Sequence, residues 1–216
     1  MSRRLKCSTS LWSADLSNLV GEIRRVEPYS ERFHLDVADG QLVDTLLFFP
    51  DLIQAIRPHT HLPFEVHLIT RNPLSWVEPF VSAGADIIIF YPNVGSDTNE
   101  TIEAIRKHGA VAGISLTLDD AVDLVDPFWV QLDTVTIVGT EIGIKGAEMD
   151  AAVPDRIRRC RSAIDDGEHR TLIQADGGIR RETVPAIAAA GADYIVPGSL
   201  MFGEDPAEMI AWLDSL

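Results

Sequence analysis

The sequence predicts a (β/α)₈ barrel, formed as a single domain by residues 1–216. Short runs rich in β-branched and aromatic residues alternate with longer amphipathic segments along the whole chain, which is typical of a parallel α/β fold. Eight such runs occur, and the length of 216 residues lies within the range of this barrel. Periodicity alone leaves a doubly wound open sheet as the alternative.

The expected strands are short, and segments with helical periodicity separate them. One helix is expected from Asp15 onward. Another is expected between residues 97 and 108, where Ile102 and Ile105 have helical spacing and Gly109 ends the pattern. A helix is expected after each strand. We expect the strands at residues 5–11, 32–38, 63–69, 85–91, 110–116, 132–138, 170–175 and 193–197.

Charge and composition exclude several classes of protein. The net charge is −15, so a nucleic-acid-binding protein, which needs clustered positive charge, is not expected. No apolar run approaches the ~20 residues of a membrane-spanning helix, and the basic segment 1–6 is not followed by the apolar run of a secretory signal. The two cysteines, Cys7 and Cys160, do not make a disulfide framework. A cytoplasmic protein without a membrane partner is expected.

Two expected neighbouring strands carry polar side chains that could act in chemistry. Side chains alternate along a strand, so His34 and Asp36 point to one face, while Leu35 and Val37 point to the other. Near the C-terminal end of a barrel strand, that inner face is where active sites lie. The pair is either a hydrogen-bonded structural pair or part of a metal or catalytic site. His67, on the next strand, is likewise either a core residue or a ligand.

Two glycine-containing turns follow the last two expected strands. Asp176 is followed by Gly177 and Gly178, and the final strand leads into Gly198 and Ser199. Glycines allow close approach of the backbone to a ligand, and the loops after strands seven and eight commonly bind phosphate in such barrels. Ordinary βα turns are the alternative, but two such turns in these positions favour a phosphate site.

Four of these residues together form a suitable ligand set for a metal. Two imidazoles and two carboxylates suit a divalent ion such as Zn²⁺, Mn²⁺, Fe²⁺ or Co²⁺, and Zn²⁺ is our first expectation. The four residues are His34, Asp36, His67 and Asp176.

At these motifs the chain resembles the ribulose-phosphate 3-epimerase family over nearly its whole length. The resemblance implies a (β/α)₈ TIM barrel of the ribulose-phosphate-binding type and a homo-oligomer. It implies that D-ribulose 5-phosphate and D-xylulose 5-phosphate are interconverted by proton transfer through an enediolate. It also implies that the four residues above are metal ligands, that Asp36 and Asp176 are the two acid/base groups, and that Ser10 contacts a substrate hydroxyl. The resemblance rests on residues 10–15, 34–40, 66–68, 176–179 and 198–203.

Several departures from the family pattern bear on the substrate. Ala38 and Ile69 stand where the family has methionines, Tyr91 stands where it has a histidine, and residues 41–45 lack its Pro-Asn pair. The loop 139–146 differs most. Its backbone could still bind phosphate through Gly143 and Gly146, and Lys145 is expected either to contact phosphate or to form a surface salt bridge.

Three alternatives remain beside the pentulose phosphate epimerase. The same reaction could act on a hexulose 6-phosphate or a tetrulose phosphate. A related aldolase or decarboxylase is disfavoured, because no lysine lies near Asp36. A non-catalytic sugar-phosphate-binding barrel is disfavoured, because all four expected ligands are present.

Overall fold

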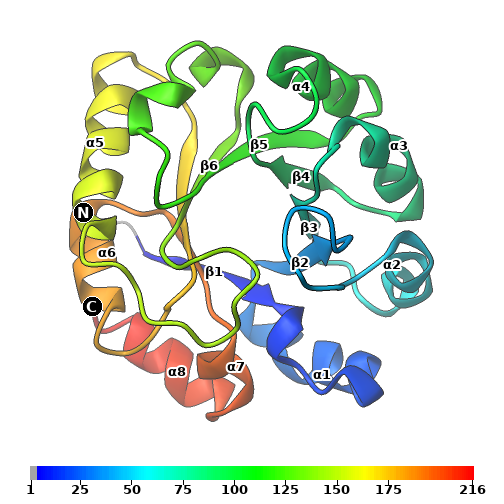
Figure 1. The fold of residues 1–216 in the computed structure, drawn as a ribbon. Helices are drawn as coiled ribbons and strands as arrows, with labels where there is room; N and C mark the ends of the chain where they lie inside the picture. Colours follow the sequence, from blue (N-terminus) through cyan, green and yellow to red (C-terminus); the bar gives the residue numbers. More distant parts are fainter. Residues whose placement is uncertain (1–3) are drawn as a thin grey trace.

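The strands form a closed, fully parallel barrel in which each strand pairs with its neighbours in chain order (Figure 1). The computed structural model describes residues 4–216, and residues 1–3 of the basic N-terminal segment lie outside the described part. The (β/α)₈ prediction is confirmed, and every expected strand boundary lies within two residues of the observed one. The strands are β1 (Lys6–Ser10), β2 (Arg32–Ala38), β3 (Phe64–Ile69), β4 (Ile87–Phe90), β5 (Val111–Leu116), β6 (Thr134–Val138), β7 (Leu172–Asp176) and β8 (Tyr194–Val196).

The helices surround the barrel and cover the outer face of the strands (Figure 1). In the expected helix 97–108, the side chain of Asp97 accepts a hydrogen bond from the backbone N–H of Glu100 and caps the first turn. The α-helices are α1 (Leu19–Val26), α2 (Pro50–Ile56), α3 (Leu74–Ala83), α4 (Thr98–Lys107), α5 (Val153–Asp166), α6 (Val184–Ala190), α7 (Ser199–Phe202) and α8 (Pro206–Leu213).

The expectation of a helix after every strand is wrong between β5 and β6. That connection contains two short 3₁₀ helices, Val122–Val125 and Trp129–Gln131, and no α-helix among its described residues. Pro127 lies between the two and cannot donate a backbone hydrogen bond, which interrupts any longer helix. The segment expected to be helical from Asp15 likewise begins as a 3₁₀ turn, Leu16–Asn18, before α1.

The two faces of the strands have opposite characters. The outward residues of β2, Phe33, Leu35 and Val37, are buried in the apolar core between the strands and the helices. The inward residues on the same strand are polar and also buried. The predicted alternation of His34 and Asp36 is therefore confirmed, and the polar side chains lie inside the barrel. In the described part of the chain, no helix is long and apolar enough to cross a membrane.

Candidate metal centre and active site

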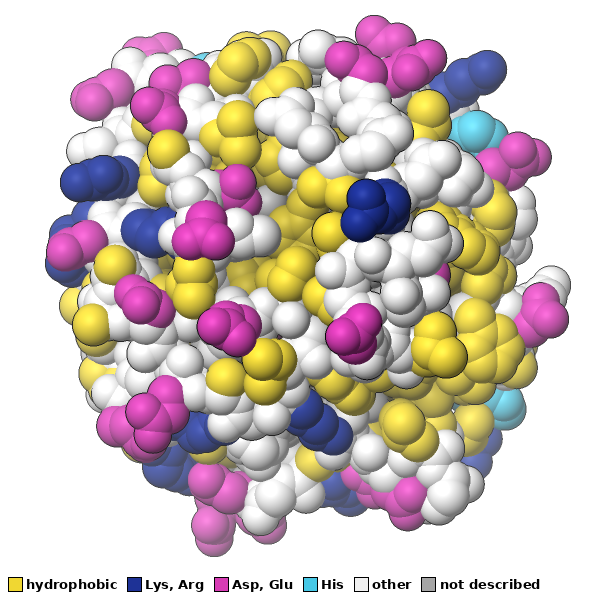
Figure 2. Space-filling view, viewed as in Figure 1, with side chains coloured by type: hydrophobic (Ala, Val, Ile, Leu, Met, Phe, Trp, Pro, Cys, Tyr) yellow, Lys and Arg dark blue, Asp and Glu magenta, His cyan; other side chains and the backbone are white. Residues whose placement is uncertain are grey.

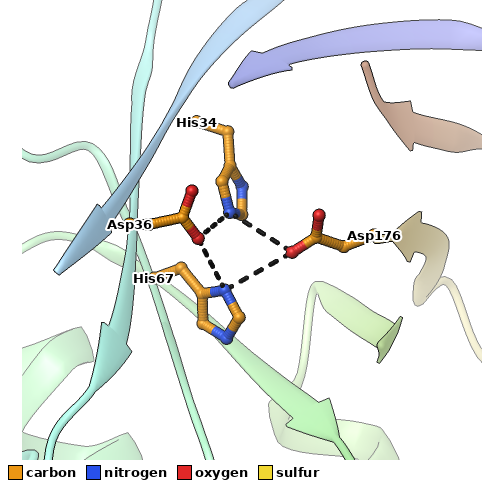
Figure 3. Close-up of side chains that lie close together, drawn as sticks. All are labelled: His34, Asp36, His67 and Asp176. Atoms are coloured by element: carbon orange, nitrogen blue, oxygen red, sulfur yellow. Dashed lines mark hydrogen bonds and ion pairs between the residues drawn. The ribbon is translucent and has the colours of Figure 1, made fainter. Parts of the chain in front are cut away.

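Four polar side chains from three strands meet inside the barrel, near the C-terminal ends of the strands (Figure 3). Asp36 on β2 pairs in register with His67 on β3, so their side chains lie side by side. His34 lies one layer deeper on β2, and Asp176 reaches the same point from the end of β7. One nitrogen or oxygen atom from each residue lies within 4.8 Å of the corresponding atoms of the other three.

The spacing of these atoms suits a shared cation. His34 Nε2 is 3.2 Å from Asp36 Oδ1 and 3.6 Å from Asp176 Oδ2, and His67 Nδ1 is 3.5 Å and 3.6 Å from the same oxygens. Two ligands at tetrahedral angles, each bonded at about 2.1 Å, lie about 3.4 Å apart. His67 Nδ1 is buried and has no hydrogen-bond partner among the described residues. The cluster could therefore hold a metal ion, and two imidazoles with two carboxylates suit Zn²⁺ and its neighbours.

Both histidines are held through the ring nitrogen that faces away from the cluster. His34 Nδ1 lies 2.7 Å from Glu65 Oε1, and Ser115 Oγ lies 2.9 Å from His67 Nε2. Sequence reasoning did not predict these partners. For Glu65, a signal existed, because it stands two residues before His67 and therefore faces the barrel interior with it.

The cluster has a strongly negative field that favours positive charge. Burial alone would lower the pKa of His34, but the charges of Asp36 and Asp176 outweigh it and raise this pKa well above its usual value. Burial would raise the pKa of Asp36, but His34 and hydrogen bonds hold it well below its usual range. The negative charge of the cluster can be balanced by a proton on His34 or by a metal cation.

A cavity of about 170 Å³ lies above the cluster and opens at the barrel mouth. Ser10, Asp36, His67 and Asp176 line its lower part, and the Ser10 hydroxyl donates a hydrogen bond of 3.2 Å to Asp36 Oδ2. The space-filling view onto the mouth shows hydrophobic side chains around a shallow central hollow and acidic side chains spread over the surrounding surface (Figure 2). The expected site residues therefore border one space, with His34 fully buried beneath it.

The glycines expected to bind phosphate line this cavity. They are Gly143, Gly146, Gly177, Gly178 and Gly198, and Ser199 lies beside them. Gly177 and Gly178 both have positive φ angles. A Cβ atom on Gly178 would lie 2.5 Å from the backbone nitrogen of Met149, so only glycine allows the loop after β6 to approach this closely.

Two cationic side chains border the same cavity. Lys145 is exposed, and its Nζ donates to the backbone carbonyl of Trp12 at 2.8 Å. The alternative of a surface salt bridge for Lys145 is not found among the ion pairs of the described residues. Arg180, which sequence reasoning missed, donates to the carbonyls of Ile179 and Gly146 at 3.0 Å and 3.5 Å. Its position four residues after Asp176, beside the two glycines, was the available signal.

One wall of the cavity is apolar. Ile69, Tyr91 and Val138 line it, and behind them Ala38 completes a small buried cluster that is separate from the main core. The ring of Tyr91 lies 5.2 Å from that of His67, and its hydroxyl is buried with no hydrogen-bond partner among the described residues. Burial, together with the charges of Asp176 and Asp36, raises the pKa of Tyr91 well above its usual value, so the hydroxyl remains a donor. This apolar cluster contains three of the departures noted in the sequence.

Solved structures of similar shape support the barrel. A mutant tryptophan synthase alpha-subunit from Pyrococcus furiosus matches with a TM-score of 0.67, covering 99% of this chain and 96% of that one, at 15% identity. A tryptophan synthase complex from the same organism matches with a TM-score of 0.66 at 18% identity, covering 100% of this chain and 97% of that one. At these identities the likeness shows the fold alone.

Sequence comparisons identify the family. Residues 6–202 match the model of the Ribulose-phosphate 3 epimerase family. A ribulose-phosphate 3-epimerase of Bacillus subtilis is 32% identical over 93% of both chains. One from Treponema pallidum is 34% identical over 94% of this chain and 93% of that protein. This chain therefore belongs to the ribulose-phosphate 3-epimerase family of carbohydrate epimerases.

Proposed function

We propose that the protein is a metal-dependent epimerase that interconverts D-ribulose 5-phosphate and D-xylulose 5-phosphate. The observation that carries the proposal is the meeting of Asp36 and Asp176 with two histidines beneath one cavity. The family supplies the reaction type, because its members are named as ribulose-phosphate 3-epimerases. The cluster supplies the groups that this chemistry needs.

The cation would be held by His34, Asp36, His67 and Asp176. We expect Zn²⁺ first, and Mn²⁺, Fe²⁺ or Co²⁺ as alternatives. Bound there, a divalent cation would polarise the substrate ketone and stabilise the negative charge that develops on its oxygen. The His67 nitrogen without a hydrogen bond and the spacing of the four atoms support this assignment.

The two carboxylates would act as the acid/base pair. They belong to β2 and β7, which are separated in the closed barrel by β1 and β8, so they approach the cavity from different directions. One carboxylate would remove the proton from the carbon beside the ketone, and the other would return a proton to the opposite face of the enediolate. Ser10, hydrogen-bonded to Asp36, would also contact a substrate hydroxyl.

The phosphate would bind at the other end of the cavity. Gly177, Gly178, Gly198 and Ser199 line the cavity after β7 and β8, and Gly143 and Gly146 line it from the loop after β6, so their backbone N–H groups would be the phosphate donors. Lys145 and Arg180 would add charge, since both border the cavity and have only backbone carbonyls as hydrogen-bond partners in the described structure. Such binding would fix the reacting carbon between the carboxylates.

A second candidate is the same reaction on a hexulose 6-phosphate or a tetrulose phosphate. The apolar wall supports this second candidate, because Ile69 and Tyr91, which depart from the family pattern, line the part of the cavity that would meet the sugar. A substrate of another length would occupy this wall differently. A non-catalytic sugar-phosphate-binding barrel would need neither carboxylate.

The test is incubation with a panel of ketose phosphates in D₂O, with NMR detection of deuterium at the carbon beside the ketone. We expect exchange and epimerisation to be fastest with D-ribulose 5-phosphate. Faster exchange with a ketose phosphate of another chain length would identify that sugar phosphate as the substrate. Binding of the sugar phosphates without exchange at any carbon, in protein loaded with Zn²⁺, Mn²⁺, Fe²⁺ or Co²⁺, would identify a binding barrel instead.

A further inference from the structure

A charged network lies directly beneath the cluster, inside the barrel. His34 on β2 pairs in register with Glu65 on β3, and His34 Nδ1 lies 2.7 Å from Glu65 Oε1. The other oxygen of Glu65 forms an ion pair of 2.8 Å with Arg32 Nη2. Glu65 is fully buried and Arg32 is 5% exposed, so both charges lie out of contact with water. A buried carboxylate remains charged only where such a partner compensates it.

Other contacts hold this carboxylate in place. Ser8 Oγ donates to Glu65 Oε1 at 2.8 Å, and Gln174 Nε2 donates to the same oxygen at 2.9 Å. Arg32 is itself held, because it donates to Gln174 Oε1 at 2.5 Å and stacks on the ring of Tyr194 at 3.9 Å. The position of Glu65 is therefore fixed from several sides, independently of His34.

The contact between Glu65 and His34 decides which ring nitrogen carries the proton. A charged carboxylate can only accept, so Nδ1 of His34 must be the donor. When His34 is neutral, its lone pair then lies on Nε2, the atom that faces Asp36 and Asp176. His67 is oriented by a weaker partner, the neutral hydroxyl of Ser115, and presents Nδ1 instead.

We propose that Glu65, fixed by Arg32, is a positioning residue that locks His34 in the metal-binding tautomer and strengthens it as a ligand. The inference rests on the proposed metal site. It assigns to Glu65 and Arg32 a role in metal binding in addition to their packing inside the barrel. Partners of this kind on a ligating histidine typically account for 10–100-fold in metal affinity.

The first test compares Co²⁺ affinity in the wild type and in Glu65→Gln, followed by the visible absorption of Co²⁺ and by competition with Zn²⁺. Glutamine has nearly the same shape, but its amide offers either an oxygen or an N–H group to His34, so it no longer fixes the tautomer. We expect a loss of affinity of about 10–100-fold and a changed Co²⁺ spectrum. Ser8→Ala is the matched control, because it removes a hydrogen bond to Glu65 without touching its charge. We expect the affinity of this control to stay within about threefold of wild type.

A second variant separates positioning from stability. The exchange Glu65→Gln with Gln174→Glu keeps one buried carboxylate beside Arg32, which contacts both positions, but removes the charge that faces His34. We expect the melting temperature of this double variant without metal to lie closer to the wild-type value than that of Glu65→Gln. We expect its Co²⁺ affinity to remain about 10–100-fold below that of the wild type. A purely structural role for Glu65 predicts that both properties recover together.

The outcomes separate this inference from the proposed function. Equal Co²⁺ and Zn²⁺ affinity in wild type and Glu65→Gln would overturn the role of Glu65 alone. Full recovery of metal affinity in the exchanged variant would do the same. A wild-type protein that binds neither ion would overturn the proposed metal site, and this inference with it.

Discussion

The floor and the roof of the cavity are built in different ways. We call the four clustered side chains of His34, Asp36, His67 and Asp176 the floor, and the loop of residues 139–152 the roof. Each floor residue lies on a strand, and strand pairing in the closed barrel fixes its position. The roof is largely exposed or half-buried and is held by isolated contacts, such as that of Lys145 with the Trp12 carbonyl. The difference teaches that the residues of the proposed metal site are fixed by strand pairing, whereas part of the proposed phosphate site lies on a loop that few contacts hold.

The largest expected effect comes from removing a floor carboxylate. Asp176→Asn should lower kcat by about 10³-fold or more, because in the proposed function it removes an acid/base group and a metal ligand together. The fold should remain intact, since the Asp176 side chain is 17% exposed and lies at the end of β7. Steady-state kinetics and circular dichroism would check both expectations. Normal turnover in this variant would contradict the assignment of the floor.

Removing the metal should affect both activity and stability. A chelator should abolish turnover, and added Zn²⁺, Mn²⁺ or Co²⁺ should restore it. A ligand present at 100 times its Kd stabilises a fold by about 2.7 kcal/mol. For a chain of this size, that corresponds to an increase in melting temperature of about 5–10 °C. Calorimetry with and without metal would measure it, and an unchanged melting temperature would argue that the floor is a structural polar cluster.

Changes in the roof and beside it should weaken substrate binding more than catalysis. Lys145→Ala and Arg180→Ala should each raise KM about tenfold with little change in kcat, because each removes a charge that would contact the phosphate in the proposed function. Kinetics with the phosphorylated ketose would show this, with Lys107→Ala on α4 as the control for the loss of a positive charge elsewhere. An unchanged KM in the Lys145 variant would indicate that its bond to Trp12 only anchors the loop.

The smallest expected effect lies in the apolar wall. Tyr91→Phe removes the hydroxyl that lacks a hydrogen-bond partner in the described structure but keeps the ring beside His67. If this hydroxyl binds the sugar, kcat/KM should fall about threefold to tenfold, which is the usual value of one neutral hydrogen bond. Comparing pentulose and hexulose phosphates in this variant would show which substrate uses the contact. No change with any of them would leave the wall as a purely steric boundary.

Part of the floor was predictable from the sequence because its signal is local, and the family resemblance supplied the rest. Alternation along 32–38 places His34 and Asp36 on one face, and apolar neighbours identify the strand. The role of Glu65 was not predictable in this way. It depends on which residue of β2 lies beside it, and that register is set by pairing across the barrel.

The roof was less predictable for a similar reason. The glycines at 143 and 146 indicated a loop, but the contact of Lys145 with Trp12 joins residues 133 positions apart in the chain. Arg180 and Tyr91 had only weak signals, a position shortly after Asp176 and a departure from the family pattern, and the tertiary structure is what places both side chains at the cavity. Pro127 is a local signal against an α-helix between β5 and β6. The regular alternation of strands and helices elsewhere in the chain nevertheless predicted a helix there.

Anomalous X-ray diffraction from crystals grown with Zn²⁺ would test the central claim most directly. With data collected on both sides of the zinc absorption edge, we predict one strong peak within about 2.0–2.2 Å of His34 Nε2, Asp36 Oδ1, His67 Nδ1 and Asp176 Oδ2. The absence of a peak there, or a peak that excludes either carboxylate, would contradict a shared metal centre between the two acid/base groups.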